Sequence, residues 1–293
     1  MVQKPYNPSA LETWKKYLRY DPTRWLLETN DPSILLWYQL DIAHRPEDAP
    51  GVIETRAQVL YSDPVQAIFA AQNGVGFWGD VENLAQPYYN ATVWNLALLA
   101  ELGIPRTSRR ARNACEFILQ NFLNDDGTFA GLNALESGYL VRAFGYFNYA
   151  NDPRALRAAR RLRQEVASYE TSVVALWGWR AFTHDEKIAD AAKENLERVL
   201  RNLQGLGANI FPQFEPRDEL FFLRVLAEYD RVHDARAAPL LDALVAKQNE
   251  RAQWTLERDL NAQLVTSLER AGEPSRWITL NVLRVIVKLV AQK

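Results

Sequence analysis

The sequence predicts an all-α protein, specifically an α/α toroid: a barrel of about six helical hairpins with an inner and an outer ring of helices. Three observations predict it. A glutamine followed by an aromatic residue recurs after helical segments, Asp-Pro pairs mark repeated helix starts, and amphipathic helices alternate with helices that are apolar on nearly every side. A recurring supersecondary unit constrains the architecture before any single residue does.

The glutamine-aromatic unit occurs three times. Residues 67–72 end in Gln72 and lead to Trp78, residues 114–120 lead to Phe129, and residues 244–248 lead to Trp254. Gln72 precedes Trp78 by the same number of residues as Gln248 precedes Trp254. We expect a structural role, in which the glutamine hydrogen-bonds the next helix end and the ring covers the joint.

Helix starts and helix character predict the two rings. Asp-Pro occurs at 21–22, 31–32, 63–64 and 152–153, where aspartate caps a first turn and proline fits just inside it. Charged, amphipathic helices are predicted at 107–121, 152–166 and 187–203, and apolar ones at 88–102, 134–149, 171–183, 217–229 and 276–291. A helix that is apolar all round must be covered all round, so the apolar set forms the inner ring. No strand is predicted.

Composition narrows the class of protein. The 293 residues contain no linker, so we predict one domain over 1–293, with N-terminal helices in 1–60 and the repeat region in 61–293. A net charge of −2 argues against a nucleic-acid partner. One cysteine, Cys115, and a polar start over residues 1–6 without signal-peptide character predict a cytoplasmic protein. Peripheral membrane contact and oligomeric state stay open.

Four segments resemble a known family. They are residues 25–34, residues 92–103, the Ser-Gly-Tyr-Leu-Val-Arg-Ala segment at 137–143, and residues 274–285. Together with the glutamine-aromatic units, they resemble squalene cyclases and protein prenyltransferases, and more narrowly the bacterial squalene-cyclase-like repeat proteins. The resemblance implies an α/α toroid with a central hydrophobic cavity for an apolar, isoprenoid ligand, and terpenoid cyclisation as the reaction.

The sequence contains only some of the residues that the chemistry of that family requires. Its Asp-x-Asp-Asp acid motif is absent, which leaves open whether the chain is an enzyme. Glu136 and Asp218 are the candidate catalytic acids, because each opens an apolar inner helix where desolvation raises a carboxyl pKa. The alternative is a first-turn carboxylate favoured by the helix dipole. The three histidines and one cysteine lack ligand spacing, so we expect no metal and no other cofactor.

Aromatic residues on or near the inner helices are the candidate ligand-binding set. They either line a pocket or fill the core, and they are Phe77, Tyr88, Tyr89, Trp94, Tyr139, Trp177 and Phe221.

Three functions follow from these features. The leading one is binding of an apolar small molecule, such as an isoprenoid, in a central cavity, with terpenoid cyclisation as the reaction of an enzyme. The second is a non-catalytic lipid-binding or scaffold protein of the same fold. The third is a carbohydrate-active (α/α) barrel, which needs two carboxylates, here Glu136 and Asp218, facing each other at about 5–10 Å.

Overall fold

The computed structural model describes residues 8–203 and 207–291, and helices dominate this part of the chain. The polar start over residues 1–6 lies outside this part of the chain. So do residues 204–206, which belong to a segment, 204–215, whose sequence predicts irregular structure. The helices are α1 (Thr23–Leu27), α2 (Pro32–Trp37), α3 (Pro50–Leu60), α4 (Asp63–Ala70), α5 (Thr92–Leu102), α6 (Arg109–Asn121), α7 (Ala134–Tyr146), α8 (Pro153–Leu162), α9 (Tyr169–Trp179), α10 (Glu186–Arg201), α11 (Glu219–Glu228), α12 (Ala238–Ala246) and α13 (Arg276–Val290).

Short elements complete the described chain. They are the 3₁₀ segments η1 (Pro8–Tyr17), η3 (Arg180–Phe182) and η4 (Ala235–Ala237), the π-helical turn η2 (Tyr38–Ile42), and two-residue strands β1 (Trp254–Thr255) and β2 (Pro274–Ser275). The all-α class is confirmed. The antiparallel pair β1–β2 was not predicted, because two residues are too few to show an alternating pattern.

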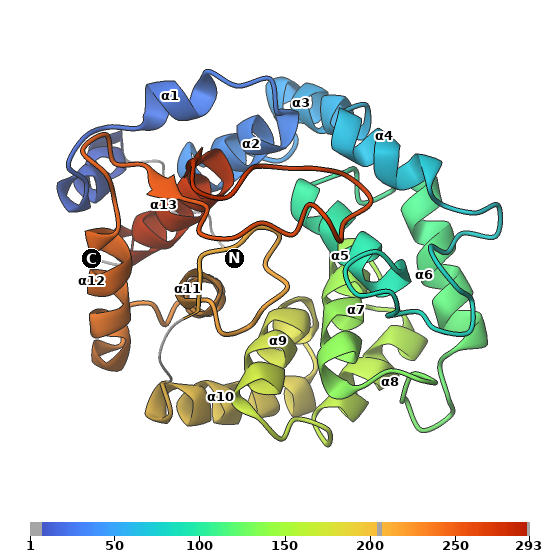
Figure 1. Cartoon of the computed structure of the whole chain (residues 1–293). Helices are drawn as coiled ribbons and strands as arrows, with labels where there is room; N and C mark the ends of the chain where they lie inside the picture. The colour runs from blue at the N-terminus through green and yellow to red at the C-terminus, as the bar shows by residue number, and fades with distance from the viewer. Residues whose placement is uncertain (1–7, 204–206, 292–293) are drawn as a thin grey trace.

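The helices lie in two sets (Figure 1). Helices α5, α7, α9, α11 and α13 stand inside, while α3, α4, α6, α8, α10 and α12 lie around them. Along the chain α5 packs on α7, α7 on α9, α9 on α11, α11 on α13, and α13 on α2. The indole N–H of Trp37, at the end of α2, donates to the carbonyl of Glu101 on α5 at 2.7 Å. This bond joins the last helix of the series to the first.

Burial separates the two sets as the sequence predicts. Every residue of α5 is buried, and so is nearly all of α9 and α11. On the outer helix α8 the buried residues are Ala155, Ala158, Ala159 and Leu162, a single stripe at helical spacing. Helix α8 therefore buries one face and leaves Arg157 and Arg160 exposed to solvent.

Glycines let α7 and α9 pack closely. A Cβ built on Gly178 would lie 2.8 Å from the carbonyl oxygen of Gly138, and one on Gly138 would lie 2.7 Å from Val174. At distances shorter than 3.0 Å a neighbouring group has to shift, which is the backbone of α7 for Gly178 and the side chain of Val174 for Gly138. The absence of these side chains sets the spacing of the two helices.

Two of the glutamine-aromatic joints use the same hydrogen bonds. The indole of Trp78 donates to Ile68 O at 2.6 Å, and the indole of Trp254 donates to Leu244 O at 2.6 Å. The backbone N–H of each tryptophan donates to a threonine hydroxyl at the following inner helix, Thr92 in one case and Thr279 in the other. The predicted structural role is confirmed for both.

Two of the glutamines tie their joint to another segment of the chain. Gln72 donates to Arg110 O on α6 at 3.1 Å. Gln248 donates to Tyr17 O and accepts from Arg19 N, which fastens the last repeat to the N-terminal segment. Gln120 differs, since it is exposed and bonds only to Glu116 at 3.3 Å. The middle repeat keeps a buried aromatic, Phe129, but lacks the glutamine bridge.

Two of the four predicted helix starts are correct as predicted, and two are shifted by one residue. Asp31 and Asp152 cap α2 and α8 with their side chains. At 63–64 the cap position is Ser62, so Asp63 lies inside the first turn of α4. At 21–22 the helix α1 begins one residue after the proline. The correction at Asp63 follows from Ser62, whose backbone already has the extended conformation of a cap.

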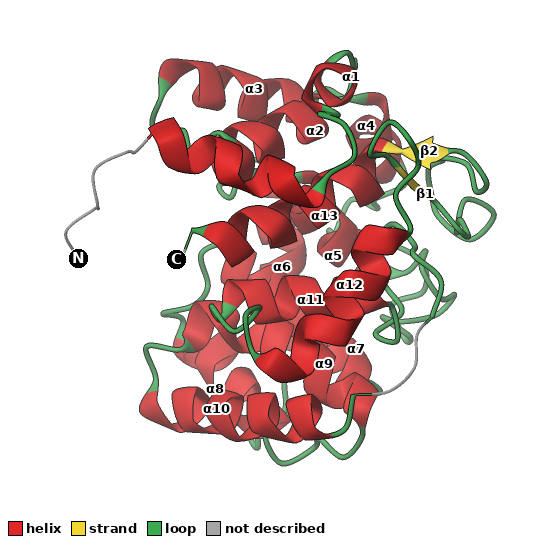
Figure 2. Ribbon diagram, turned by 90° about the vertical axis from the view of Figure 1, so that its left-hand side faces the viewer, coloured by secondary structure: helices red, strands yellow, loops and turns green. Residues whose placement is uncertain are grey.

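Two long segments cross one end of the inner helices (Figure 1). Residues 207–218 precede α11, and the other segment runs between β1 and β2. Ile210 and Arg258 form an isolated bridge between them, and Asn209 and Glu257 exchange hydrogen bonds. Figure 2 shows the strand pair on one side and the C-terminal end of α13 on the other. The two ends of the inner helices are therefore covered differently.

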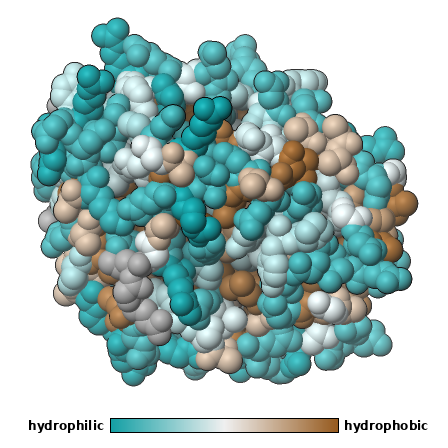
Figure 3. Space-filling view, in the orientation of Figure 1, coloured by the Kyte–Doolittle hydropathy of each residue, from teal (hydrophilic) through white to brown (hydrophobic). Residues whose placement is uncertain are grey.

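The face shown in Figure 3 is largely hydrophilic, with apolar atoms in separate small areas. Three of the exposed large apolar residues, Val75, Val81 and Tyr88, lie in the connection between α4 and α5, and the others are Tyr20, Leu27, Ile53 and Tyr61. Within the described residues, no helix combines the length and the apolar character that a membrane crossing requires.

Candidate functional site

Six of the seven predicted ligand-binding aromatics form one connected column. It starts at Tyr88 and Tyr89, runs through Trp94 on α5 and Tyr139 on α7, and ends at Trp177 on α9 and Phe221 on α11. Successive ring centroids lie 5.6 Å (Tyr88–Trp94), 5.2 Å (Tyr89–Trp94), 5.2 Å (Trp94–Tyr139), 6.0 Å (Tyr139–Trp177) and 4.9 Å (Trp177–Phe221) apart. These are the separations of packed aromatic pairs.

Phe214 fills the side of this column. Its ring lies 5.5 Å from that of Tyr89, 5.2 Å from Trp94 and 5.7 Å from Tyr139. It is only 2% exposed, and Tyr139 is fully buried. Sequence reasoning missed Phe214 because residues 207–218 show no helical period. A residue from a loop therefore packs against three rings of the column and fills the space beside them.

Phe77 lies apart from the column. Its ring stacks on Phe117 of the outer helix α6, with centroids 5.2 Å apart and planes 22° from parallel. The residue is half-buried. The structure therefore does not bring Phe77 together with the other predicted residues.

Glu136 acts as a helix cap. It is the third residue of α7, and its Oε2 accepts the backbone N–H of Asn133 at 2.9 Å. The side chain of Asn133 in turn accepts the N–H of Leu135 and of Glu136, which completes a capping box. The carboxylate is buried, and its Oε2 is used for the hydrogen bond of this capping box.

Asp218 caps α11 and has an unusual pKa. Its Oδ1 accepts the N–H of Leu220 at 2.7 Å and of Phe221 at 3.4 Å, and its Oδ2 accepts the N–H of Ile210 at 3.2 Å. Burial raises its pKa to about 7, against the lowering effect of these three N–H groups and of Lys247. Asp218 therefore carries a proton over much of the acidic range while holding residues 207–218 to α11.

Charged side chains from the inner helices meet at the opposite end of the column. Glu101 on α5 pairs with Arg224 on α11 at 3.0 Å, and both are almost fully buried. Arg142 on α7 donates to both carboxylate oxygens of Glu228 on α11 at 2.9 Å. Arg284 on α13 lies 2.7 Å from Asp41. Three cations thus face three anions.

Trp177 joins the aromatic column to these ion pairs. Its indole N–H donates to Glu228 Oε1 at 3.2 Å, and the Arg142 guanidinium lies 4.7 Å from its ring centroid. Burial alone raises the pKa of Glu101, but the Arg224 guanidinium outweighs it and holds the pKa below its usual value. Arg224 also donates to the side chain of Gln213. Ion pairs and aromatic rings therefore form one continuous interior.

The sequence carries a signal for these ion pairs that was not used. Glu101, Arg142, Arg224 and Arg284 are isolated charges within otherwise apolar inner helices. A charge on a helix that is buried all round requires a partner, and here the partner lies on another element: α11 for the charges of α5 and α7, and η2 for Arg284 of α13. Which charges pair is not encoded in any local spacing.

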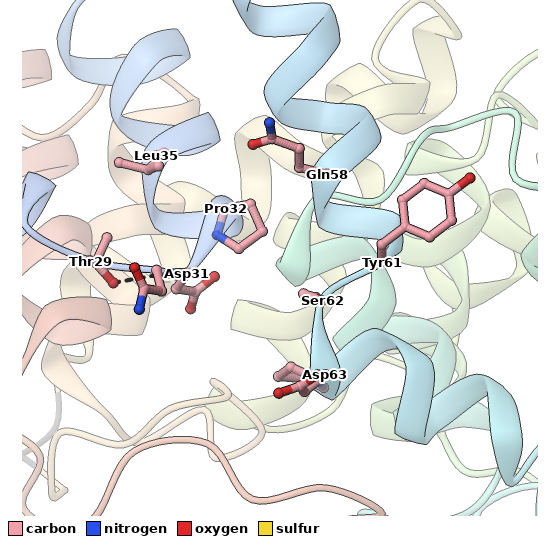
Figure 4. A pocket seen from close by; sticks show the side chains of 10 residues that line it. Thr29, Asp31, Pro32, Leu35, Gln58, Tyr61, Ser62 and Asp63 are labelled. Atoms are coloured by element: carbon pink, nitrogen blue, oxygen red, sulfur yellow. Dashed lines mark hydrogen bonds between the residues drawn. The ribbon is translucent and has the colours of Figure 1, made fainter.

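A groove lies between the start of α2 and the turn from α3 to α4 (Figure 4). It has a volume of about 630 Å³, and its walls carry Thr29, Asn30, Asp31, Pro32, Leu35, Gln58, Tyr61, Ser62, Asp63 and Pro64. Its polar groups are amides, hydroxyls and two carboxylates, and Asp31 is used as the cap of α2. None of the predicted site residues lines it.

No protein-family model matches the chain, and neither a curated protein nor a solved structure matches it. The resemblance to squalene-cyclase-like repeat proteins stays a prediction.

Proposed function

We propose that this chain is an α/α toroid whose axis is a packed core, and that it acts as a non-catalytic scaffold of that fold rather than as a terpenoid cyclase. The observation that carries the proposal is the position of Phe214, which packs against Tyr89, Trp94 and Tyr139. A cyclase needs a dry cavity that holds its substrate near a protonated acid. In this chain that space is taken by side chains.

The two candidate acids also favour a scaffold. Glu136 and Asp218 each use their oxygens for backbone N–H groups at helix starts. An acid that protonates an alkene has to present its O–H to the substrate, and breaking these caps costs about 0.5–2 kcal/mol each. The same capping gives the carbohydrate-active alternative little support. The single, buried Cys115 fits the reducing cytoplasm.

Product analysis tests the proposal. The purified protein is incubated with squalene and separately with geranylgeranyl diphosphate, and extracts are compared with those of an active squalene cyclase. We expect neither substrate to be converted. A cyclised product that disappears in Asp218→Asn but persists in Asp63→Asn, a carboxylate outside the column, would overturn the proposal.

Binding of an apolar small molecule, such as an isoprenoid, is the second candidate. It has one specific observation in its favour, since Tyr88 at the outer end of the column is 45% exposed and gives the column a contact with solvent. Native mass spectrometry of the purified protein separates the two candidates. A co-purified isoprenoid that is lost on Trp94→Leu and retained on Phe77→Leu would favour the second.

A further inference from the structure

A cavity of about 270 Å³ opens where the ion pairs reach the surface, at the end of the inner helices opposite residues 207–218. It is lined by Leu40, Asp41, His44, Arg224, Ala227, Glu228, Arg284, Val285 and Lys288. These residues come from η2 and the residue pair after it, from α11 and from α13. Five of the nine are charged, which is unlike the apolar axis expected from the sequence.

The charges on the wall leave one cation in excess. Arg224, Arg284 and Lys288 face Asp41 and Glu228, which is three cations against two anions. Behind the wall, Glu101 pairs with Arg224 and Arg142 pairs with Glu228, so these two interior groups add no net charge. Asp230 lies 3.9 Å from the Nζ of Lys288, but both side chains are more than half exposed, so water screens that pair. Burial, followed by the charge of Lys288, lowers the pKa of His44, which keeps this residue neutral at physiological pH.

Two polar groups at the cavity have hydrogen-bonding capacity that the described residues do not use. Arg284 uses Nη1 for Asn281 and places Nε beside Asp41, which leaves its Nη2 without a hydrogen bond to the described residues. The Oδ2 of Asp41 is buried and has no aligned donor in the same part of the chain. A guanidinium nitrogen without a hydrogen bond thus borders the same cavity as the carboxylate of Asp41, which is paired with Arg284 through Oδ2 and whose side chain is 35% exposed.

We propose that this cavity binds a small carboxylate that also carries a hydrogen-bond donor, such as a hydroxyl or ammonium group. The ligand carboxylate pairs with Arg284 and Lys288, and the donor group reaches Asp41. The remaining guanidinium nitrogen, Nη2 of Arg284, and the ammonium of Lys288 together suit the two oxygens of a carboxylate. The excess positive charge favours a ligand with a net negative charge or a zwitterion.

A matched set of three-carbon acids tests the ligand class. Propanoate has no added donor, lactate adds a hydroxyl and alanine adds an ammonium, and each is titrated by calorimetry at constant ionic strength. We expect saturable binding, with lactate or alanine bound about tenfold more tightly than propanoate, a difference equivalent to about 1.4 kcal/mol. Absence of saturable binding for all three overturns the proposal.

Variants locate the binding to this cavity. Lys288→Ala changes a half-exposed side chain and should weaken binding about tenfold without unfolding the protein. Arg284→Gln should weaken it further, and Asp41→Asn should remove the preference for lactate or alanine over propanoate. Arg24→Gln alters an exposed arginine of α1 as the control. If Lys288→Ala and Asp41→Asn bind all three acids as the unmodified protein does, the proposal fails. It is independent of the scaffold function, because carboxylate binding and isoprenoid turnover are measured separately.

Discussion

Glu101 on α5 and Arg224 on α11 form an ion pair across the inner helices, with Oε2 and Nη1 3.0 Å apart and side chains 6% and 4% exposed. The residues are far apart in sequence. Both oxygens of Glu101 take part, because Nη2 of Arg224 also reaches Oε1 at 3.3 Å. The pair fixes how α5 and α11 face each other.

Loss of one partner should be costly. Glu101→Gln leaves the buried Arg224 without its counter-charge, and we expect the free energy of unfolding to fall by about 3–5 kcal/mol. The exposed pair Arg24–Glu28 is the control, and Glu28→Gln should change stability by about 0–1 kcal/mol. Urea unfolding monitored by circular dichroism measures both. Equal changes in the free energy of unfolding would show that the buried pair contributes no more to stability than the exposed pair.

The pKa of Asp218 predicts a pH dependence of stability. Because the folded state holds this proton up to about pH 7 and an unfolded aspartate releases it near pH 4, the stabilising contribution is complete below about pH 4. It is lost as the pH rises toward 7. Asp218→Asn keeps an oxygen for the cap and removes the titration. The unfolding free energy of the unmodified protein should therefore fall relative to that of Asp218→Asn between pH 4 and pH 7. A constant difference would show that Asp218 titrates normally.

The glutamine joints should differ in strength. Gln248→Ala removes bonds to Tyr17 and Arg19, and Gln72→Ala removes bonds to Gly76 and Arg110. We expect each to cost about 1–3 kcal/mol, since backbone groups lose their partners. Gln120→Ala is the matched control, and as an exposed site it should stay within about 0.5 kcal/mol. Thermal unfolding of the three variants ranks them. If Gln120→Ala lowers the free energy of unfolding as much as the other two variants do, the hydrogen bonds of Gln72 and Gln248 are not the cause of the loss.

Gly103, just after α5, is constrained both by its left-handed backbone conformation and by the close approach of α2, and a comparison with Gly131 separates the two effects. Its φ is +82°, and an added Cβ would lie 2.8 Å from Leu36. Gly131 has a φ of +74° with no atom near its Cβ position. Alanine at Gly131 therefore reports backbone strain alone, about 1 kcal/mol, and alanine at Gly103 adds a clash with α2 of about 1–3 kcal/mol. If both variants lose the same free energy of unfolding, α2 moves away from the added Cβ at Gly103 without an energetic penalty.

Local pattern was sufficient for most of the fold. Apolar helices such as α5 and α9 and amphipathic ones such as α8 differ in how many of their faces are apolar, and this difference is visible in one stretch of chain. The joints at Trp78 and Trp254 were predictable for the same reason, because the glutamine, the turn and the aromatic residue lie within a few positions. Residues 207–218 have no such period, and Phe214 was therefore missed.

The sequence by itself determined the helices, their division into two kinds and the aromatic residues of the column, since each depends on neighbours along the chain. Only the tertiary structure decided that Phe214 closes the column, that Glu136 and Asp218 serve as caps, and that Glu101, Arg142 and Arg284 find partners on other elements. Packing and charge pairing depend on distances between segments remote in sequence, and no local periodicity encodes those distances.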